Sequence, residues 1–91
     1  MAVADTIRQK LTASFAPATL VVEDDSARHA GHSGAQPGGE THFNVKIVST
    51  AFAGLSRVER QRRVYAALAD ELAASVHALS LTTQTPDEAA R

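Results

Sequence analysis

The architecture follows from three segments of the chain: HFNVKIVS at residues 42–49, SRVERQRRVYAALADELAAS at residues 56–75 and ALSLTT at residues 78–83. In the first segment, Phe43, Val45 and Ile47 alternate with polar residues, and this period of two predicts a strand with one buried face. Leu79 and Leu81 alternate in the same way in the third segment. A strand, a long helix and a strand in succession favour a right-handed crossover, so we expect the two strands to be parallel.

The segment between these strands has the pattern of one long helix. Ser56 and Glu59 form a capping-box pattern, in which the hydroxyl and the carboxylate each bind a backbone amide that would otherwise lack a partner. Arg60 and Arg63 point away from the apolar side of this helix. At 100° per residue, the apolar side chains gather in one stripe formed by Val58, Tyr65, Leu68, Ala69 and Leu72. We therefore predict a helix from Ser56 to about Ser75.

The N-terminal segment predicts a second, shorter helix. Ile7, Leu11 and Phe15 recur every four residues and make one apolar stripe. Pro17 ends the pattern. We expect the helix to run from Asp5 to Phe15, with the Asp5 carboxylate as its N-cap.

One more strand and a long loop lie between the first helix and residue 42. The run TLVVE at residues 19–23 predicts a strand that pairs antiparallel with the strand beginning at His42. Residues 25–41 hold four of the chain's five glycines, so we expect a long glycine-rich loop there. Loops of this length in a small domain are commonly functional or disordered.

Together these elements predict a single α+β domain over residues 1–91, in the order αββαβ. We expect two layers, a mixed three-stranded sheet with both helices on one face. The other face is left polar by Asn44, Lys46, Ser80 and Thr82. The sequence TPDE at residues 85–88 resembles a short C-terminal helix with proline at its first position, but few residues follow, so residues 86–91 are expected to fray.

Composition excludes several classes of function. The formal net charge is -1, which removes the global attraction to phosphate that a basic nucleic-acid-binding protein has. Cysteine is absent, so this chain supplies no thiol nucleophile and no thiolate ligand. We find no catalytic motif and expect a protein without enzymatic activity. With no leader and no apolar run of membrane-spanning length, the expected compartment is the cytoplasm.

The four histidines are the most informative polar residues. His29 and His32 lie in the predicted loop, His42 opens a strand, and His77 lies where the long helix meets the last strand. Imidazole binds borderline metals such as zinc, copper and iron. Solvated or backbone-bonded histidines are the alternative interpretation. Two ligands do not make a stable site, so a metal interpretation requires a second protein that supplies the remaining ligands, as two histidines and two cysteines share the Rieske [2Fe–2S] cluster.

A basic cluster at the start of the long helix suggests a second kind of site. The cluster consists of Arg57, Arg60, Arg62 and Arg63. Together with the negative charge of Glu59, these four arginines give a local charge of +3. These side chains, with Lys46 on the open sheet face, have the chemistry to contact DNA phosphates. The alternative is a solvated helix face with Glu59 and Arg63 as an i,i+4 pair.

Over residues 7–88 the chain resembles the BolA family. The resemblance rests on several motifs: Asp25-Ser26 and Arg28-His29, Gly39-Glu40-Thr41-His42-Phe43, Phe52, Gly54-Leu55-Ser56-Arg57-Val58-Glu59-Arg60, Val64-Tyr65, Asp70-Glu71-Leu72, and Val76-His77-Ala78-Leu79-Ser80-Leu81. It implies a fold similar to the class II KH topology. It also implies a monothiol glutaredoxin as partner, with a shared [2Fe–2S] cluster whose other iron is held by the glutaredoxin cysteine and glutathione. Without that partner we expect no cofactor.

The resemblance also assigns roles to individual residues. His77 matches the C-terminal histidine ligand of the family, and His29 matches the loop ligand. His32 is the rival loop ligand, because the loop carries extra residues relative to shorter members. Asp25 and Gln61 depart from the glutamate and histidine that are frequent in the family at these places, so no role transfers to Gln61. Some family members are described as DNA-binding transcriptional regulators, which makes DNA the alternative partner.

Overall fold

A computed structural model describes residues 3–24, 42–74 and 76–91. In chain order the elements are α1 (Val3–Phe15), β1 (Thr19–Asp24), β2 (His42–Val48), the 3-10 helix η2 (Thr50–Phe52), α2 (Arg57–Ala67), α3 (Ala69–Ala74), β3 (Ala78–Gln84) and α4 (Pro86–Ala89). The predicted glycine-rich loop at residues 25–41 lies outside the described residues.

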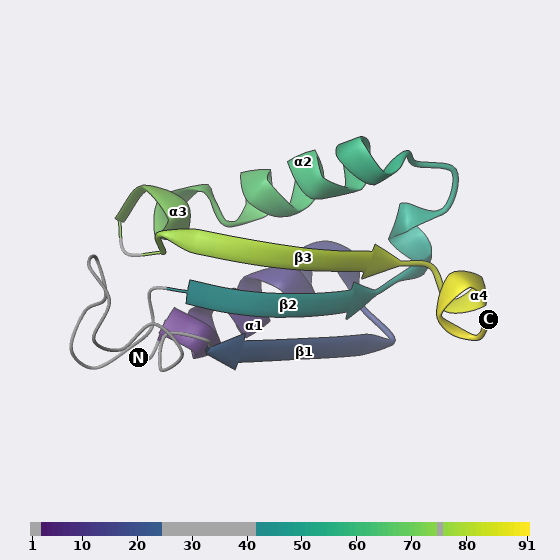
Figure 1. Ribbon diagram of the computed structural model, residues 1–91, viewed down its shortest axis with the longest axis horizontal. Helices are drawn as coiled ribbons and strands as arrows, with labels where there is room; N and C mark the ends of the chain where they lie inside the picture. Colours follow the sequence, from purple (N-terminus) through teal and green to yellow (C-terminus); the bar gives the residue numbers. More distant parts are fainter. Residues whose placement is uncertain (1–2, 25–41, 75) are drawn as a thin grey trace.

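The described strands form one mixed sheet in the order β1-β2-β3 (Figure 1). β1 and β2 pair antiparallel, with Thr19 opposite Val48, and β2 and β3 pair parallel, with His42 opposite Ala78. The predicted parallel pairing of the two strands that flank the helical connection is therefore confirmed. The helix-and-sheet architecture and the mixed three-stranded sheet are confirmed, and the relation to class II KH domains stays a prediction.

The core lies between one face of the sheet and the helices. Ile7 and Leu11 of α1 and Phe43 and Ile47 of β2 are buried, as their spacing predicts. The opposite face carries Lys46 and other polar side chains, and it faces the viewer in Figure 1 with α1 behind the sheet. Asp5 lies within the first turn of α1, which begins at Val3, so its predicted N-cap role is wrong. Its carboxylate instead accepts from Arg8 one turn later.

A buried hydroxyl joins three elements at one end of the sheet. Ser49 follows β2 and has no exposed surface. Its Oγ donates to the Phe15 carbonyl oxygen at 2.7 Å and accepts from the Ala51 amide at 3.0 Å. Its own amide donates to the Gln84 carbonyl oxygen at 2.9 Å. One residue thereby fixes the end of α1, the start of η2 and the end of β3.

The predicted long helix is two helices, α2 and α3, which meet at Leu68. The predicted stripe is buried only in part: Leu68 is in the core and Leu72 packs against it, whereas Val58 and Tyr65 are outside it. Val64 and Leu68 have 0% and 1% of their surface exposed, whereas Val58 and Tyr65 keep 56% and 39%. The stripe assumed one straight helix of about twenty residues. The helix ends at Ala67 and α3 begins at Ala69, so α2 and α3 need not share one face.

The C-terminal segment is a capped helix. Thr85 and Glu88 form a capping box around α4, which confirms the short C-terminal helix. Pro86–Ala89 are helical in the structure, and the expectation that residues 86–91 fray stays a prediction. Arg60 of α2 donates to both carboxylate oxygens of Glu88, at 2.6 and 3.3 Å, and this contact spans 28 residues of sequence. Four residues do not hold a helix alone, and here an ion pair from α2 anchors them.

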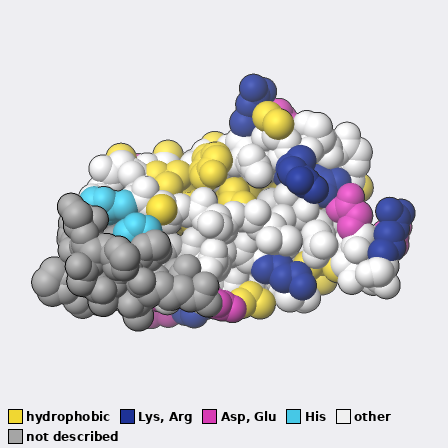
Figure 2. Space-filling model, viewed as in Figure 1, with side chains coloured by type: hydrophobic (Ala, Val, Ile, Leu, Met, Phe, Trp, Pro, Cys, Tyr) yellow, Lys and Arg dark blue, Asp and Glu magenta, His cyan; other side chains and the backbone are white. Residues whose placement is uncertain are grey.

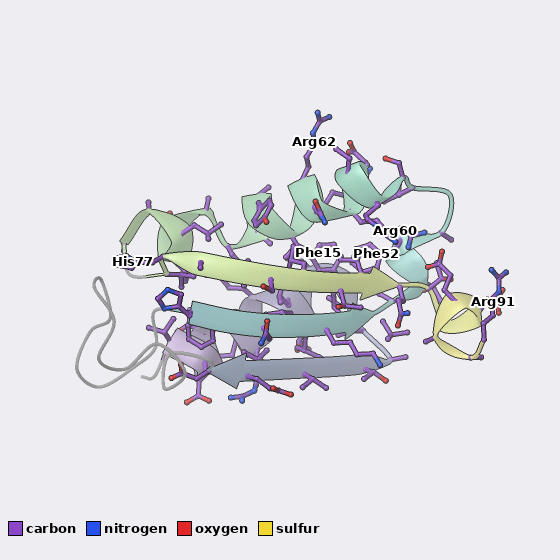
Figure 3. All side chains as sticks on the ribbon, in the orientation of Figure 1. Phe15, Phe52, Arg60, Arg62, His77 and Arg91 are labelled. Atoms are coloured by element: carbon purple, nitrogen blue, oxygen red, sulfur yellow. The ribbon has the colours of Figure 1, made fainter. Side chains whose placement is uncertain are left out.

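The Arg60 side chain is largely buried where α4 meets the core. Only 11% of its surface is exposed. Its Nε donates to the Leu55 carbonyl oxygen at 3.0 Å and its Nη1 to that of Thr83 at 3.3 Å. The guanidinium also lies over the Phe52 ring, 5.9 Å from its centroid (Figure 3). The expectation that Arg60 points away from the apolar face is wrong, because its stem and head fill the gap between α2 and α4.

The corrected helix face makes a prediction about two valines of α2. Val64→Ala removes buried methyl groups and leaves a cavity, so we expect a loss of about 2 kcal/mol in the free energy of unfolding. Val58→Ala is the matched control, and it is expected to change that free energy by less than about 0.5 kcal/mol. Urea unfolding of both variants measures the difference. Equal losses would contradict the observed face.

The Arg60–Glu88 ion pair predicts a pH-dependent stability. The pKa of the Glu88 carboxyl is lowered from 4.5 to about 2 by the hydrogen bond from Arg60 and, next, by the backbone amide of Thr85. A carboxyl with a lowered folded pKa stabilises the fold above its unfolded pKa and loses this effect as the pH falls through the folded value.

Glu88→Gln is therefore expected to unfold at a lower temperature than wild type at pH 7. The gap should close between about pH 5 and about pH 2, because the wild-type carboxyl gains its proton in that window. Thermal unfolding of both proteins across this range measures the effect. A gap that stays constant with pH would show that the carboxylate charge contributes nothing.

Candidate functional site

His77 lies at the entrance to β3 with its side chain exposed. Its neighbour Val76 is buried, and the Val76 amide donates to the Glu71 carbonyl oxygen at 2.9 Å. Because successive side chains of extended backbone point in opposite directions, burial of Val76 directs His77 outward. The predicted ligand is therefore accessible to a partner molecule.

A second imidazole lies beside His77. His42 is the first residue of β2 and is half-buried. The two rings are 6.5 Å apart between centroids, with an angle of 29° between their planes. The sequence places His42 at the start of this strand and predicts no ligand role for it. The predicted parallel pairing could have placed His42 beside His77, because the amino ends of two neighbouring parallel strands meet at one edge of the sheet.

The end of β1 lies at the same edge. Asp24 pairs with Phe43, so the residues that flank segment 25–41 both reach the edge that carries His42 and His77. Figure 2 shows the histidine side chains together at this end of the molecule. The predicted loop ligands His29 and His32 lie outside the described residues, and their roles stay predictions.

The metal-ligating side chains at this edge fit a site that is shared with a second molecule better than a site formed by these residues alone. Across residues 3–24, 42–74 and 76–91, no group of three or more histidine, cysteine or acidic residues is arranged to hold a metal ion. The chain also has no cysteine. An exposed imidazole suits iron or zinc as one donor among several. The residues present therefore fit a [2Fe–2S] cluster only where a second molecule supplies the thiolate ligands.

The predicted basic cluster is divided by the structure. Arg62 and Arg63 are exposed, and both lie near Glu59, with N–O distances of 3.8 and 3.5 Å. The predicted i,i+4 pair of Glu59 and Arg63 is confirmed. Figure 3 shows Arg62 pointing away from the sheet, whereas Arg60 turns toward Phe52. Since Arg60 is engaged by Glu88, it is not presented to a phosphate together with its neighbours.

Two further predicted contacts are exposed. Arg57 is the first residue of α2, directly after the N-cap Ser56, whose Oγ accepts from the Glu59 amide. Lys46 lies on the open face of the sheet, as predicted. No helix in the described part of the chain is long and apolar enough to cross a membrane.

Comparison with known proteins gives consistent matches. A family model described as BolA-like protein matches residues 11–88. Protein BOLA1, chloroplastic, of Arabidopsis thaliana is 48% identical over 87 residues, which cover 93% of this chain and 54% of that protein. The DNA-binding transcriptional regulator BolA of Escherichia coli strain K12 is 42% identical over 88 residues, which cover 97% of this chain and 80% of that protein. The solved structure of BolA1 from Arabidopsis thaliana has a TM-score of 0.82 at 46% identity, with 93% of each chain covered.

These relatives limit what is carried over. The chain spans about half the length of the chloroplastic relative, so the activity of that whole protein does not transfer directly. The bacterial relative is named as a regulator and not as an enzyme. One relative is named as chloroplastic, so the cytoplasmic location of this chain stays a prediction.

Proposed function

Because the chain belongs to the family of BolA-like proteins, we propose that it is a non-enzymatic partner of a monothiol glutaredoxin with which it shares a bridging [2Fe–2S] cluster, for iron–sulfur trafficking or iron regulation. The observation that supports this most directly is the exposed imidazole of His77 at the entrance to β3. It needs no rearrangement of the core to reach a ligand on another protein.

The metal ligands that this chain can supply favour a site that is divided between two proteins. His77 provides one donor, and His29 or His32 from the segment that joins β1 to β2 provides the other. Both ends of that segment start from the edge that holds His77. The glutaredoxin cysteine and glutathione hold the second iron, because this chain has no thiolate. When bound, the cluster would supply one-electron and iron-transfer chemistry that the chain itself lacks.

Because His77 is exposed, a substitution there should affect cluster binding without affecting the stability of the fold. Its side chain is exposed, so its removal is expected to change the free energy of unfolding by less than about 0.5 kcal/mol. His42, its stacked neighbour, provides a control at the same edge. A loss of cluster binding on His77 substitution is then attributable to the lost donor.

The test is reconstitution of the two proteins with iron, sulfide and glutathione. We expect His77→Ala to lose the visible absorption and circular-dichroism bands that distinguish the mixed complex from the glutaredoxin homodimer, and to shorten the lifetime of the cluster. One of His29→Ala and His32→Ala should behave in the same way, and the other should match wild type.

The control is His42→Ala, which keeps His77 and should keep the bands of the mixed complex. Thermal unfolding of each variant verifies the fold. Spectra of His77→Ala that are identical to wild type would contradict the proposal, as would a mixed complex that never forms.

DNA binding is the second candidate function, and the name of the bacterial relative favours it. The contacts available are Arg57, Arg62 and Arg63 at α2 and Lys46 on the open sheet. Arg60 would contribute through the placement of α4, since its guanidinium is held by Glu88. The net charge of -1 restricts such binding to this local surface.

Salt dependence tests the DNA candidate. Each phosphate contact lowers log K against log salt with a slope of about 0.9, so Arg62→Gln should reduce the slope by about that amount and weaken binding. Arg8→Gln on α1 is the matched control because it removes the same charge elsewhere. A filter-binding or fluorescence titration at several salt concentrations measures both. A slope that Arg62→Gln leaves unchanged would exclude this surface.

A further inference from the structure

An ion pair joins α1 to α3, two helices that are far apart in the sequence. Lys10 of α1 donates to both carboxylate oxygens of Glu71 in α3, at 2.9 Å each, across 61 residues of sequence. The Glu71 side chain has only 13% of its surface exposed, and that of Lys10 has 34%. A carboxylate that is largely buried is costly to leave without its partner. The contact therefore holds α3 against α1.

The helix α3 depends on such contacts for its position. It has six residues and none of them is fully buried. A helix of this length forms only where tertiary contacts support it. Leu72 supplies an apolar contact, since it packs against the core. Lys10 supplies a charged one, and its hydrogen bond to Glu71 is the main reason that the Lys10 pKa is raised, so the lysine keeps its charge at neutral pH.

Glu71 also supports the start of β3 through its backbone. Its carbonyl oxygen accepts from the Val76 amide at 2.9 Å, and Val76 is buried. The next residue is the exposed His77, and Figure 1 shows α3 beside the start of β3. Glu71 is thus tied to α1 by its side chain and to the neighbour of His77 by its carbonyl oxygen. A displacement of α3 would break this connection and release the backbone that carries the imidazole.

The neighbouring acid has a different environment. Asp70 precedes Glu71 in the chain, and its Oδ2 lies 3.6 Å from Lys10 Nζ. The Asp70 side chain has 92% of its surface exposed. An ion pair this exposed contributes little to stability. Of the two acids, Glu71 therefore makes the contact that matters, and Asp70 is a matched control one residue away.

We propose that Lys10 and Glu71 are positioning residues for His77, which hold it in place while it binds the shared cluster. This inference rests on the proposed function, because that function makes His77 a ligand. When the ion pair opens, α3 and the hydrogen bond between Glu71 and Val76 loosen, and His77 leaves the iron. The imidazole decides whether the mixed complex binds the cluster, and the ion pair decides how long the cluster stays bound.

The test compares hydrogen exchange in the free full-length chain with the lifetime of the reconstituted cluster. We expect Lys10→Gln and Glu71→Gln each to speed the exchange of the Val76 amide about two- to fivefold, because each removes one charge of a partly exposed pair. The rate of cluster loss should rise by the same factor, since the same opening releases His77. The absorption and circular-dichroism bands of the mixed complex should be retained, unlike those of His77→Ala.

Two variants serve as controls. Asp70→Asn removes a negative charge next to Glu71 and should match wild type in both measurements. Lys10→Arg keeps a cation that can bind both carboxylate oxygens, so it should keep an amide exchange rate and a cluster lifetime close to those of wild type. Thermal unfolding of every variant verifies the fold.

Three results would overturn the positioning role. The first is an unchanged exchange rate of the Val76 amide in Lys10→Gln and Glu71→Gln. The second is faster exchange with an unchanged cluster lifetime, and the third is an Asp70→Asn variant that loses the cluster as fast as Glu71→Gln. A wild-type mixture without the bands of the mixed complex would contradict the proposed function and the positioning role with it, and the wild type alone reveals that outcome.

Discussion

The parallel pairing of β2 with β3, closed at one end by Ser49, is the constraint on which the rest of the molecule depends. Among the described residues, Ser49 is the one polar side chain that is fully buried. Its hydroxyl and amide satisfy groups of α1, η2 and β3 at once. A buried group with every bond satisfied fixes one arrangement of these elements, since any shift leaves a donor or acceptor unpaired. The register then sets His42 level with Ala78 at one edge and Val48 level with Gln84 at the other.

This register gives the two ends of β3 different chemistry. The amino end carries imidazoles, one of them exposed, and the carboxyl end leads into a cleft walled by arginines. The distance along the strand keeps the two ends from sharing residues. A substitution at one end is therefore expected to leave the other undisturbed.

Ion pairs between distant helices decide which charges remain available. Lys10 of α1 donates to both carboxylate oxygens of Glu71 in α3, at 2.9 Å each, and this hydrogen bond is the main reason that the Lys10 pKa is raised. Arg60 of α2 holds Glu88 of α4 in the same manner. Both ion pairs make these basic side chains less available to a ligand. The net charge of the chain is therefore a poor guide to its local fields, because Arg57 and Arg91, which have no ion pair with the residues that the structure describes, line the same cleft.

Local patterns in the sequence determined the strands, the first helix, the start of α2 and the pairing of the strands. The period of two in residues 43–47, the four-residue spacing of Ile7, Leu11 and Phe15, and the Ser56 cap each depend on near neighbours, and each predicted its element. The outward position of Lys46 and the Glu59–Arg63 pair followed in the same way.

Tertiary structure decided everything that depends on contacts between distant residues. The predicted single helix is divided at Leu68, and Val64 and not Val58 entered the core. Arg60 became a buried anchor because Glu88 arrives from 28 residues away. His42 gained a neighbour in His77 because β2 and β3 pair in parallel. Periodicity indicates which side of an element is apolar, but it does not indicate which residues that side contacts. The function of this protein depends on those contacts.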